Sequence, residues 1–341
     1  MKAQKLIGLA LAVLMIGAFA ATVQAAPTQE DLDFYKGKLV TYIVATKPGG
    51  GYDAYGRLVG RYLQKYLPGS TVIIKNVPGA GHIIGANEVY LSKPDGLIIG
   101  TFNTGLIYSQ IVGQEGIKFD LTKYSWIGKA SSETRVILAG NKTTYQTIKD
   151  VLDSKDEIKV PASGVGSQDF NETSVLAIAL PAKFKPIPGY GGNEGEMAIL
   201  RGECQVIIGS YTGLMGFIKS KECRVLLQFG SEHKIPALAN VPHISELSVS
   251  PRGKSLINLV NNIDMIGRLT AAPPGVPAGR LEVLRDAYKK AVTDPEILQE
   301  GAKLGLEFDP AYGDDVQKMI REAINQPEDN LKLLKEIIKI E

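Results

Sequence analysis

The sequence predicts an α/β fold with two domains, and three observations lead to this prediction. The chain has 341 residues, and a domain usually holds about 100–200 residues, so length alone favours about two domains. Apolar residues make up 44% of the chain and charged residues 22%, which is typical of globular proteins. Short apolar runs also alternate with segments of helical period along almost the whole chain. Continuous apolar strands separated by helices are typical of mainly parallel sheets that helices cover on both faces.

The first 25 residues are typical of a secretory signal peptide. Lys2 and Lys5 form a basic start, and the uncharged run from Leu6 to Ala21 follows them. This run is shorter than the about 20 apolar residues that a membrane-spanning helix needs, although a retained N-terminal anchor is the alternative. Small residues at Val23 and Ala25 predict cleavage after Ala25, so the mature protein is expected to be exported.

Charge and motif content exclude several classes of protein. Removal of the first 25 residues takes two lysines from the 38 basic groups and leaves 36 basic against 36 acidic groups, so the basic excess of a nucleic-acid-binding protein is missing. The two cysteines and three scattered histidines form no metal motif. Neither a Gly-x-Ser-x-Gly elbow, a Gly-x-x-x-x-Gly-Lys phosphate loop nor a His-Glu-x-x-His motif occurs. We therefore predict no metal and no cofactor, and ligand binding is favoured over catalysis.

Eight apolar runs are predicted to form strands. They are 39–45, 72–75, 97–101, 135–139, 158–162, 205–209, 224–229 and 267–271. The clearest helix begins at Asp53 and ends at Pro68-Gly69, because its apolar side chains recur at helical spacing. These side chains are Tyr55, Leu58, Val59, Tyr62, Leu63 and Tyr66. The segments after Trp126 and before Pro273 are expected to cross between domains. The amphipathic tail from Asp314 is expected to dock on the body of the protein.

Cys204 and Cys223 each stand just before an apolar run, with a predicted helix between the two runs. If these runs were adjacent parallel strands, their starts would lie within disulfide reach, at about 5.5 Å between Cα atoms. Export to an oxidising compartment favours a structural disulfide between them. Two buried free thiols are the alternative.

The turn Thr46–Asp53, between the first predicted strand and its helix, is a candidate anion site. Its three glycines, Gly49 to Gly51, let the backbone come close to a ligand without interference from a Cβ atom. Asp53 is suited to the N-cap of the helix. The free N–H groups of the helix start then suit a carboxylate ligand. A plain tight turn is the alternative.

Four more turns follow predicted strands or resemble known loops. Gly79-Ala80-Gly81 is only a weak dinucleotide fingerprint, because no acidic residue ends the next strand. Asn103-Thr104 ends a strand with polar groups, and Ser163–Ser167 forms a second candidate anion cradle before a helix. Pro188–Gly192 is the last of these turns. Together they place polar groups at the carboxyl ends of strands, where open α/β sheets bind ligands.

Several of these motifs together resemble one family, the receptors of tripartite tricarboxylate transporters, which are Bug-type periplasmic solute-binding proteins. The resemblance covers nearly the whole mature chain in order. It is carried by Lys47-Pro48-Gly49-Gly50-Gly51-Tyr52-Asp53, Asn76-Val77-Pro78-Gly79-Ala80-Gly81, Lys93-Pro94-Asp95-Gly96, Ser163–Ser167, Tyr190-Gly191-Gly192, Leu200-Arg201-Gly202-Glu203 and Ala272-Pro273-Pro274-Gly275-Val276-Pro277. Tyr52 departs from the small hydroxyl residue that many relatives have there.

The resemblance implies the type II periplasmic binding fold, with two α/β domains around a central ligand cleft. The expected domains are 26–132 with 264–341, and 133–263. The ligand is expected to be a small organic acid, held by backbone amides and hydroxyls more than by arginine. A membrane permease is the expected partner, and the protein is expected to be a monomer. The candidate ligand-binding residues are Gly50, Gly51, Tyr52, Asp53, Asn103, Thr104, Ser163, Gly166, Ser167, Tyr190 and Tyr211, of which Asp53 is expected to shape its loop.

Two other classes of function remain open at this point. An exported sensor subunit for a membrane kinase would share the same fold. An exported enzyme acting on a small polar substrate would need a nucleophile and a base about 3 Å apart, and no adjacent pair of that kind occurs in the sequence. The identity of the acid also stays open, including its length, its aromatic or aliphatic character and the presence of an amine.

Overall fold

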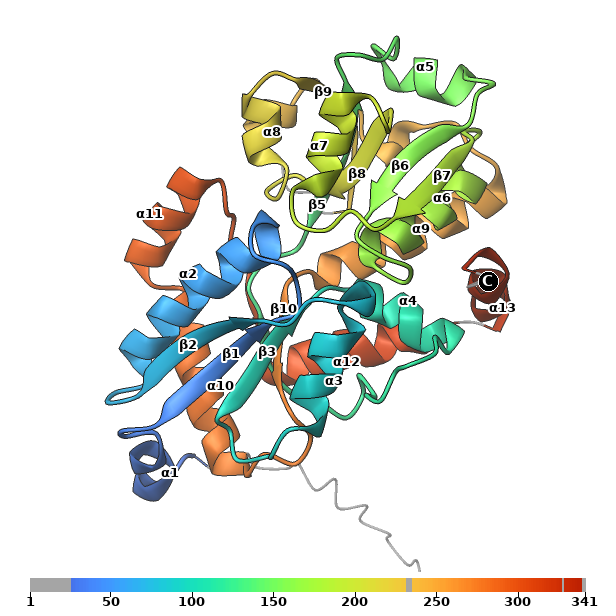
Figure 1. Ribbon diagram of the computed structural model, residues 1–341. Helices are drawn as coiled ribbons and strands as arrows, with labels where there is room; N and C mark the ends of the chain where they lie inside the picture. The colour runs from blue at the N-terminus through green and yellow to red at the C-terminus, as the bar shows by residue number, and fades with distance from the viewer. Residues whose placement is uncertain (1–25, 231–234, 327, 339–341) are drawn as a thin grey trace, which may run out of the picture.

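The computed structural model describes residues 26–230, 235–326 and 328–338. The predicted signal peptide and its cleavage site after Ala25 lie outside the described residues, on the N-terminal side of Ala26. The described chain forms two halves, each built around its own strands (Figure 1). No helix of the described chain is both long enough and apolar enough to cross a membrane.

The first half is built on a six-stranded sheet with the order β11-β4-β10-β3-β1-β2. Its strands β1 to β4 run in one direction, and β10 and β11 run against them. The bounds are β1 Leu39–Val44, β2 Thr71–Asn76, β3 Ile98–Phe102, β4 Ser125–Lys129, β10 Leu269–Ala272 and β11 Ala311–Tyr312. Strands of one direction joined by helices put the loops after β1, β2 and β3 at one edge of the sheet.

Several α-helices of the described chain belong to this half. They are α1 Gln29–Phe34, α2 Gly50–Tyr66, α3 Ile83–Leu91, α4 Gly105–Val112, α10 Ala278–Val292, α11 Pro295–Leu304 and α12 Gly313–Ile324. The amphipathic α2 packs on α10, and the buried Tyr55, Leu58 and Leu63 of α2 belong to one apolar cluster with Leu284 and Tyr288 of α10. The helical spacing read from the sequence is therefore confirmed.

The second half contains a three-stranded sheet, β8-β5-β9, and a parallel pair, β6 and β7. Both β8 and β9 run antiparallel to β5. The bounds are β5 Thr134–Gly140, β6 Ile158–Ala162, β7 Phe184–Pro188, β8 Val206–Ser210 and β9 Cys223–Gly230. The helices are α5 Ile148–Asp153, α6 Gln168–Ala179, α7 Glu194–Arg201, α8 Met215–Lys219 and α9 Pro251–Ile266.

All eight predicted strands are present, and three more were not predicted. The strand β7 was not predicted because it contains Pro186 and Pro188. Proline is typical of sheet edges and weakens the pattern of a strand. The strand β4 lies in the segment that was interpreted only as a crossing, and β11 has two residues. Most strands of the first sheet share a direction, as predicted. The strand β10 runs antiparallel to β3, and β5 runs antiparallel to β8. Both lie next to the two segments through which the chain passes between the halves (Figure 1).

The predicted disulfide between Cys204 and Cys223 is wrong, because both cysteines are buried free thiols. Cys204 precedes β8 and Cys223 begins β9, as expected. However, β5 pairs with both strands and lies between them, so the two strand starts are not neighbours. The sequence predicts both strands, but it does not show that β5 lies between them in the sheet.

We expect both thiols to be unreactive in the folded protein and reactive after unfolding. Burial raises the pKa of the Cys223 thiol to about 11 and also raises the pKa of Cys204, so little thiolate is present at neutral pH. Titration of the purified protein with a thiol reagent should therefore find no fast-reacting group without denaturant and two groups in guanidinium chloride. Two unreactive sulfurs in guanidinium chloride would contradict the assignment of free thiols.

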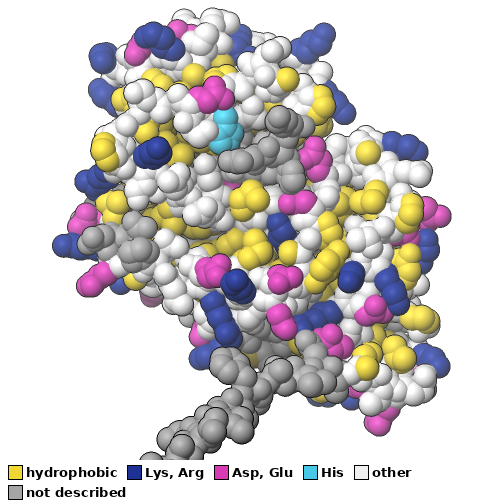
Figure 2. All heavy atoms as spheres, turned by 180° about the vertical axis from the view of Figure 1, so that it is seen from behind, with side chains coloured by type: hydrophobic (Ala, Val, Ile, Leu, Met, Phe, Trp, Pro, Cys, Tyr) yellow, Lys and Arg dark blue, Asp and Glu magenta, His cyan; other side chains and the backbone are white. Residues whose placement is uncertain are grey.

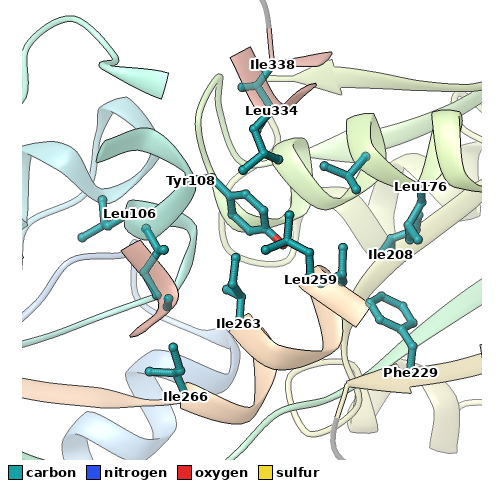
Figure 3. Packing of buried hydrophobic residues seen from close by; sticks show 14 of the residues in the cluster. Leu106, Tyr108, Leu176, Ile208, Phe229, Leu259, Ile263, Ile266, Leu334 and Ile338 are labelled. Atoms are coloured by element: carbon teal, nitrogen blue, oxygen red, sulfur yellow. The ribbon is translucent and has the colours of Figure 1, made fainter. Parts of the chain in front are cut away.

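The two halves share a continuous apolar core on one side of the molecule. Figure 3 shows Tyr108 of α4 surrounded by Leu259 and Ile263 of α9 and by Leu334 and Ile338 of the tail. The tail includes α13, Glu328–Ile337, which contacts both α4 and α6. Docking of the amphipathic tail is thus confirmed. Figure 2 shows basic and acidic side chains interspersed over the back face, as expected for a chain of balanced charge.

Candidate functional site

A cavity of about 340 Å³ lies between the two halves of the protein. Loops that follow β1, β2 and β3 line it from the first half, and loops that follow β6, β7 and β8 line it from the second. This is the position at the carboxyl ends of strands where open α/β sheets bind ligands. Its volume is at the lower end of the range for pockets that hold small molecules, about 300–1,000 Å³.

The start of α2 forms the wall on the side of the first half. Gly49 and Gly50 have φ angles of 89° and 76°, a conformation that side chains of L residues rarely adopt. The N-cap is Gly49, so the prediction that Asp53 occupies this position is wrong. The first N–H groups of a helix have no partner within it, and here they belong to Gly50, Gly51 and Tyr52, all in the cavity wall. This wall therefore suits an anion.

Asp53 shapes this loop and does not line the cavity. Its carboxylate accepts hydrogen bonds from the backbone N–H of Gly49 at 3.0 Å, from Asn76 at 2.8 Å and from Arg57 at 2.9 Å. Burial alone would raise the pKa of Asp53, but these three donors lower it below its usual value. The carboxylate thus stays charged and keeps the glycine turn folded.

The turn Ser163–Ser167 forms part of the opposite wall, and a carboxylate of the protein already occupies its donors. The backbone N–H and the hydroxyl of Ser163 both donate to Asp169 Oδ2 at 2.8 Å. The hydroxyl of Ser167 donates to Asp169 Oδ1. The predicted second anion cradle therefore holds Asp169, which lies in the first turn of α6 and also lines the cavity.

Six of the eleven predicted site residues line the cavity and five do not. The six are Gly50, Gly51, Tyr52, Asn103, Ser163 and Tyr190. The five outside it are Asp53, Thr104, Gly166, Ser167 and Tyr211. Ser167 caps α6, and the carbonyl of Gly166 accepts hydrogen bonds from Ser109 and Asn171. Tyr211 packs in an apolar cluster of the second half, and Thr104 is completely buried.

A cluster of buried charges beside the cavity was missed by the sequence analysis. Its members are Glu133, Arg135, Glu172, Asp264 and Arg268, none more than 4% exposed. Arg135 Nε donates to Glu172 at 2.9 Å and its Nη1 donates to Glu133 at 3.2 Å. In the sequence, these charged residues interrupt or adjoin apolar runs. A charge that is buried must be paired, so this pattern could have indicated the cluster.

The charge states in this cluster follow from its contacts. Burial would raise the pKa of Glu133, but Arg268 and Arg135 lower it below the usual value, so this carboxylate is ionised. Burial and the neighbouring Glu172 raise the pKa of Asp264 well above its usual value. Gln168 Nε2 donates to both Glu172 and Asp264, at 2.7 and 2.9 Å.

Arg268 connects the two halves behind the cavity wall, next to Gly51. Its guanidinium lies between the rings of Tyr52 and Tyr55, 4.4 and 4.5 Å from their centroids. Its Nη2 donates to Ser210 at 3.1 Å and to Thr212 at 3.0 Å, in the second half. The hydroxyl of Tyr52 donates to Glu133 at 2.5 Å. Tyr52 is therefore held by two groups of the cluster, so its ring has a fixed position in the cavity wall.

His82 is a buried wall residue whose titration contributes to stability. Burial lowers the pKa of His82 to about 4 from its ordinary 6.5, although the carboxylates of Asp169 and Glu133 oppose this shift. The folded protein thus favours the neutral ring. This contribution to the free energy of unfolding is complete above pH 6.5 and is lost as the pH falls towards 4. The difference between the two pKa values corresponds to about 3 kcal/mol.

We expect His82→Asn to weaken the pH dependence of stability. Between pH 7.5 and 4.5, the free energy of unfolding should fall by about 2–3 kcal/mol less in the variant than in the wild type. Asparagine suits the φ of 80° at this position. Urea denaturation at both pH values measures the effect. Equal pH dependence in His82→Asn and the wild type would contradict it.

The chain belongs to the tripartite tricarboxylate transporter family of receptors, since the family model matches residues 56–338. Protein BugT of Bordetella pertussis (strain Tohama I) is 26% identical over 245 residues, 68% of this chain and 72% of that protein. MatC of Rhodopseudomonas palustris, solved with bound malate, has a TM-score of 0.71 at 17% identity and covers 89% of this chain and 99% of its own. A second R. palustris protein, solved with adipate, has a TM-score of 0.74 at 17% identity and covers 88% and 97%.

These comparisons confirm three of the predictions. The family resemblance is confirmed by the family model. The two-domain α/β fold of periplasmic binding proteins is confirmed by the solved structures. The protein is a solute-binding receptor and not an enzyme, because its family consists of transporter receptors.

Proposed function

We propose that this protein is a periplasmic receptor that binds a small organic acid between its halves and delivers it to the permease subunits of a tripartite tricarboxylate transporter. The start of α2 in the cavity wall is the observation that carries the proposal, because it offers N–H groups to a carboxylate. Two proteins of the same fold were solved with malate and with adipate, and these ligands support an organic acid as the ligand of this protein. Membership of a family of transporter receptors supports the transport role.

Within this proposal, the ligand contacts are the six predicted residues that line the cavity, with Gly50, Gly51 and Tyr52 at the carboxylate. Asp53 acts by holding the glycine turn. The proposed domains are 26–132 with 264–341, and 133–263, so that Arg268 reaches from one domain to Ser210 of the other. The protein acts as a monomer in the periplasm, after cleavage behind Ala25.

Closure of the halves over the acid removes water and strengthens each hydrogen bond to the carboxylate. A bond of this kind contributes about 1.5–3 kcal/mol, and micromolar affinity needs only about 8 kcal/mol in total. A few amide donors therefore suffice even after the cost of ordering the loops. The closed form also presents a shape that a membrane partner can distinguish from the open form.

A thermal-shift panel on the ligand-free mature protein tests the proposal. The panel contains mono-, di- and tricarboxylates, aromatic acids, amino acids and sugars. A ligand at 100 times its dissociation constant stabilises the folded state by about 2.7 kcal/mol, which clearly raises the melting temperature. Shifts confined to acids support the proposal. A response to sugars alone, or to no compound, would contradict it.

The delivery step needs a separate measurement in cells. Uptake of the radiolabelled acid should require both this protein and its permease subunits, and it should stop when either gene is deleted. Uptake that continues without this receptor would contradict the transport role while leaving the binding result intact.

A further inference from the structure

The two walls of the cavity differ in charge. On the side of the first half, the wall includes the glycine turn and the start of α2, which offer N–H donors. On the side of the second half, the wall contains two carboxylates, Asp169 and Glu196. A ligand that spans the cavity therefore meets donors at one end and acceptors at the other.

Glu196 is a carboxylate of this wall that forms no ion pair with the described residues. It lies in α7 and lines the cavity together with Pro161, Ile207 and Leu214. No Lys, Arg or His side chain in the described part of the chain forms an ion pair with its carboxylate. Burial raises its pKa, and only its own backbone N–H opposes this shift. Glu196 is only partly buried, and an ammonium group of a ligand would give its carboxylate a charged donor.

The cations of the cavity wall are already paired. Lys47 binds Glu194 at 3.0 Å, and Arg135 binds both Glu133 and Glu172. His82 is neutral at pH 7, since burial lowers its pKa to about 4. The second charge of a dicarboxylate would thus find no unpaired cation among the described wall residues, and it would face the two carboxylates.

A second acceptor in the wall also lacks a donor. Gln168 is 2% exposed and donates its Nε2 to Glu172 and Asp264, which fixes the orientation of its amide. Its Oε1 has no hydrogen-bond partner. The wall formed by the second half is thus short of donors, and this favours a ligand that brings its own.

We propose that the ligand is a zwitterion, with a carboxylate held at the start of α2 and an ammonium group paired with Glu196. This inference rests on the proposed function, because it requires an acid in the same cavity. It narrows the substrate class from organic acids in general to amino acids. Asp169 is a second carboxylate of the cavity wall, and its negative charge adds to the attraction for a positively charged ligand group.

Matched pairs of ligands test the proposal by titration calorimetry on the ligand-free protein. Each pair exchanges one carboxylate for an ammonium group at similar length: succinate against 4-aminobutanoate, glutarate against 5-aminopentanoate, and adipate against 6-aminohexanoate. Glutamate and aspartate are added as α-amino acids. We expect at least one amino acid to bind 10-fold or more tightly than every dicarboxylate.

The outcomes separate this inference from the proposed function. A dicarboxylate that binds as tightly as the best amino acid would overturn the zwitterion while leaving an organic-acid receptor in place. Failure of every acid to bind would overturn both. Neither result depends on a variant that must fold.

The variant Glu196→Gln tests the role of the carboxylate directly. It removes the charge at nearly constant volume, so the affinity for the best amino acid should fall 10-fold or more and that for dicarboxylates should stay equal or rise. Glu222→Gln, at an exposed position outside the cavity wall, is the matched control and should leave both affinities unchanged. Wild-type affinity for the amino acid in a folded Glu196→Gln protein would overturn the proposal.

Discussion

Replacement of Arg135 with methionine is expected to lower the free energy of unfolding by about 3–5 kcal/mol. The side chain of Arg135 is buried and forms ion pairs with both Glu133 and Glu172. Its removal leaves buried carboxylates with too few partners, because desolvation of an unpaired charge costs several kcal/mol. Urea denaturation followed by circular dichroism at pH 7 measures the difference.

Two further variants show whether the loss comes from the unpaired carboxylates. In Arg135→Met/Glu172→Met, part of the stability should return, because Glu133 keeps Arg268 at 3.6 Å as a partner. Arg201→Met removes an arginine from a pair with Glu203 that is about half exposed, and it should cost less than about 1 kcal/mol. A loss below about 1 kcal/mol for Arg135→Met itself would contradict the role assigned to the cluster.

The variant Gly51→Val is expected to lower the affinity for the acid ligand at least 100-fold while the protein remains folded. A Cβ atom at Gly51 would lie 2.7 Å from Nη2 of Arg268, so the guanidinium must move. That movement breaks the hydrogen bonds from Arg268 to Ser210 and Thr212, which join the halves. The new side chain also stands among the amides that we propose hold the carboxylate.

Titration calorimetry with the ligand found in the panel measures the loss, and the thermal transition reports folding. Gly51 does not have the positive φ of its neighbours, so valine causes no backbone strain there. Gly216→Val is the matched control, because a Cβ atom at the exposed Gly216 would meet no other atom within 4 Å. Wild-type affinity in a folded Gly51→Val protein would remove the glycine turn from the proposed site.

Local signals were sufficient for most of the fold. The helical spacing from Tyr55 to Tyr66 identified α2, and its start at Gly50 lies three residues before the predicted one. Apolar runs identified eight strands, since a buried strand needs continuous apolar residues whatever its neighbours are. The amphipathic tail likewise had to cover its apolar face, and Leu334 and Ile338 do lie in the core.

The candidate site could be predicted only in part. Six residues in loops after strands were placed in the cavity wall, because loops at one edge of a sheet converge. The sequence did not predict that Asp169 accepts the hydrogen bonds of the Ser163 turn. The same motif occurs whether its donors are free or bound to a carboxylate of the protein. Arg135 and Glu196 lay outside every recognised motif.

Local patterns in the sequence were enough to predict the α/β class, eight of the eleven described strands in their order, the glycine turn before α2 and the family. These depend on periodicity and on short motifs, which are properties of neighbouring residues. The tertiary structure shows that β5 separates the strands of Cys204 and Cys223, and that, among the described residues, Glu196 forms no ion pair while Arg135 forms two. The physical reason is that ion pairs and strand neighbours join residues far apart in the chain, and no local pattern records which of them meet.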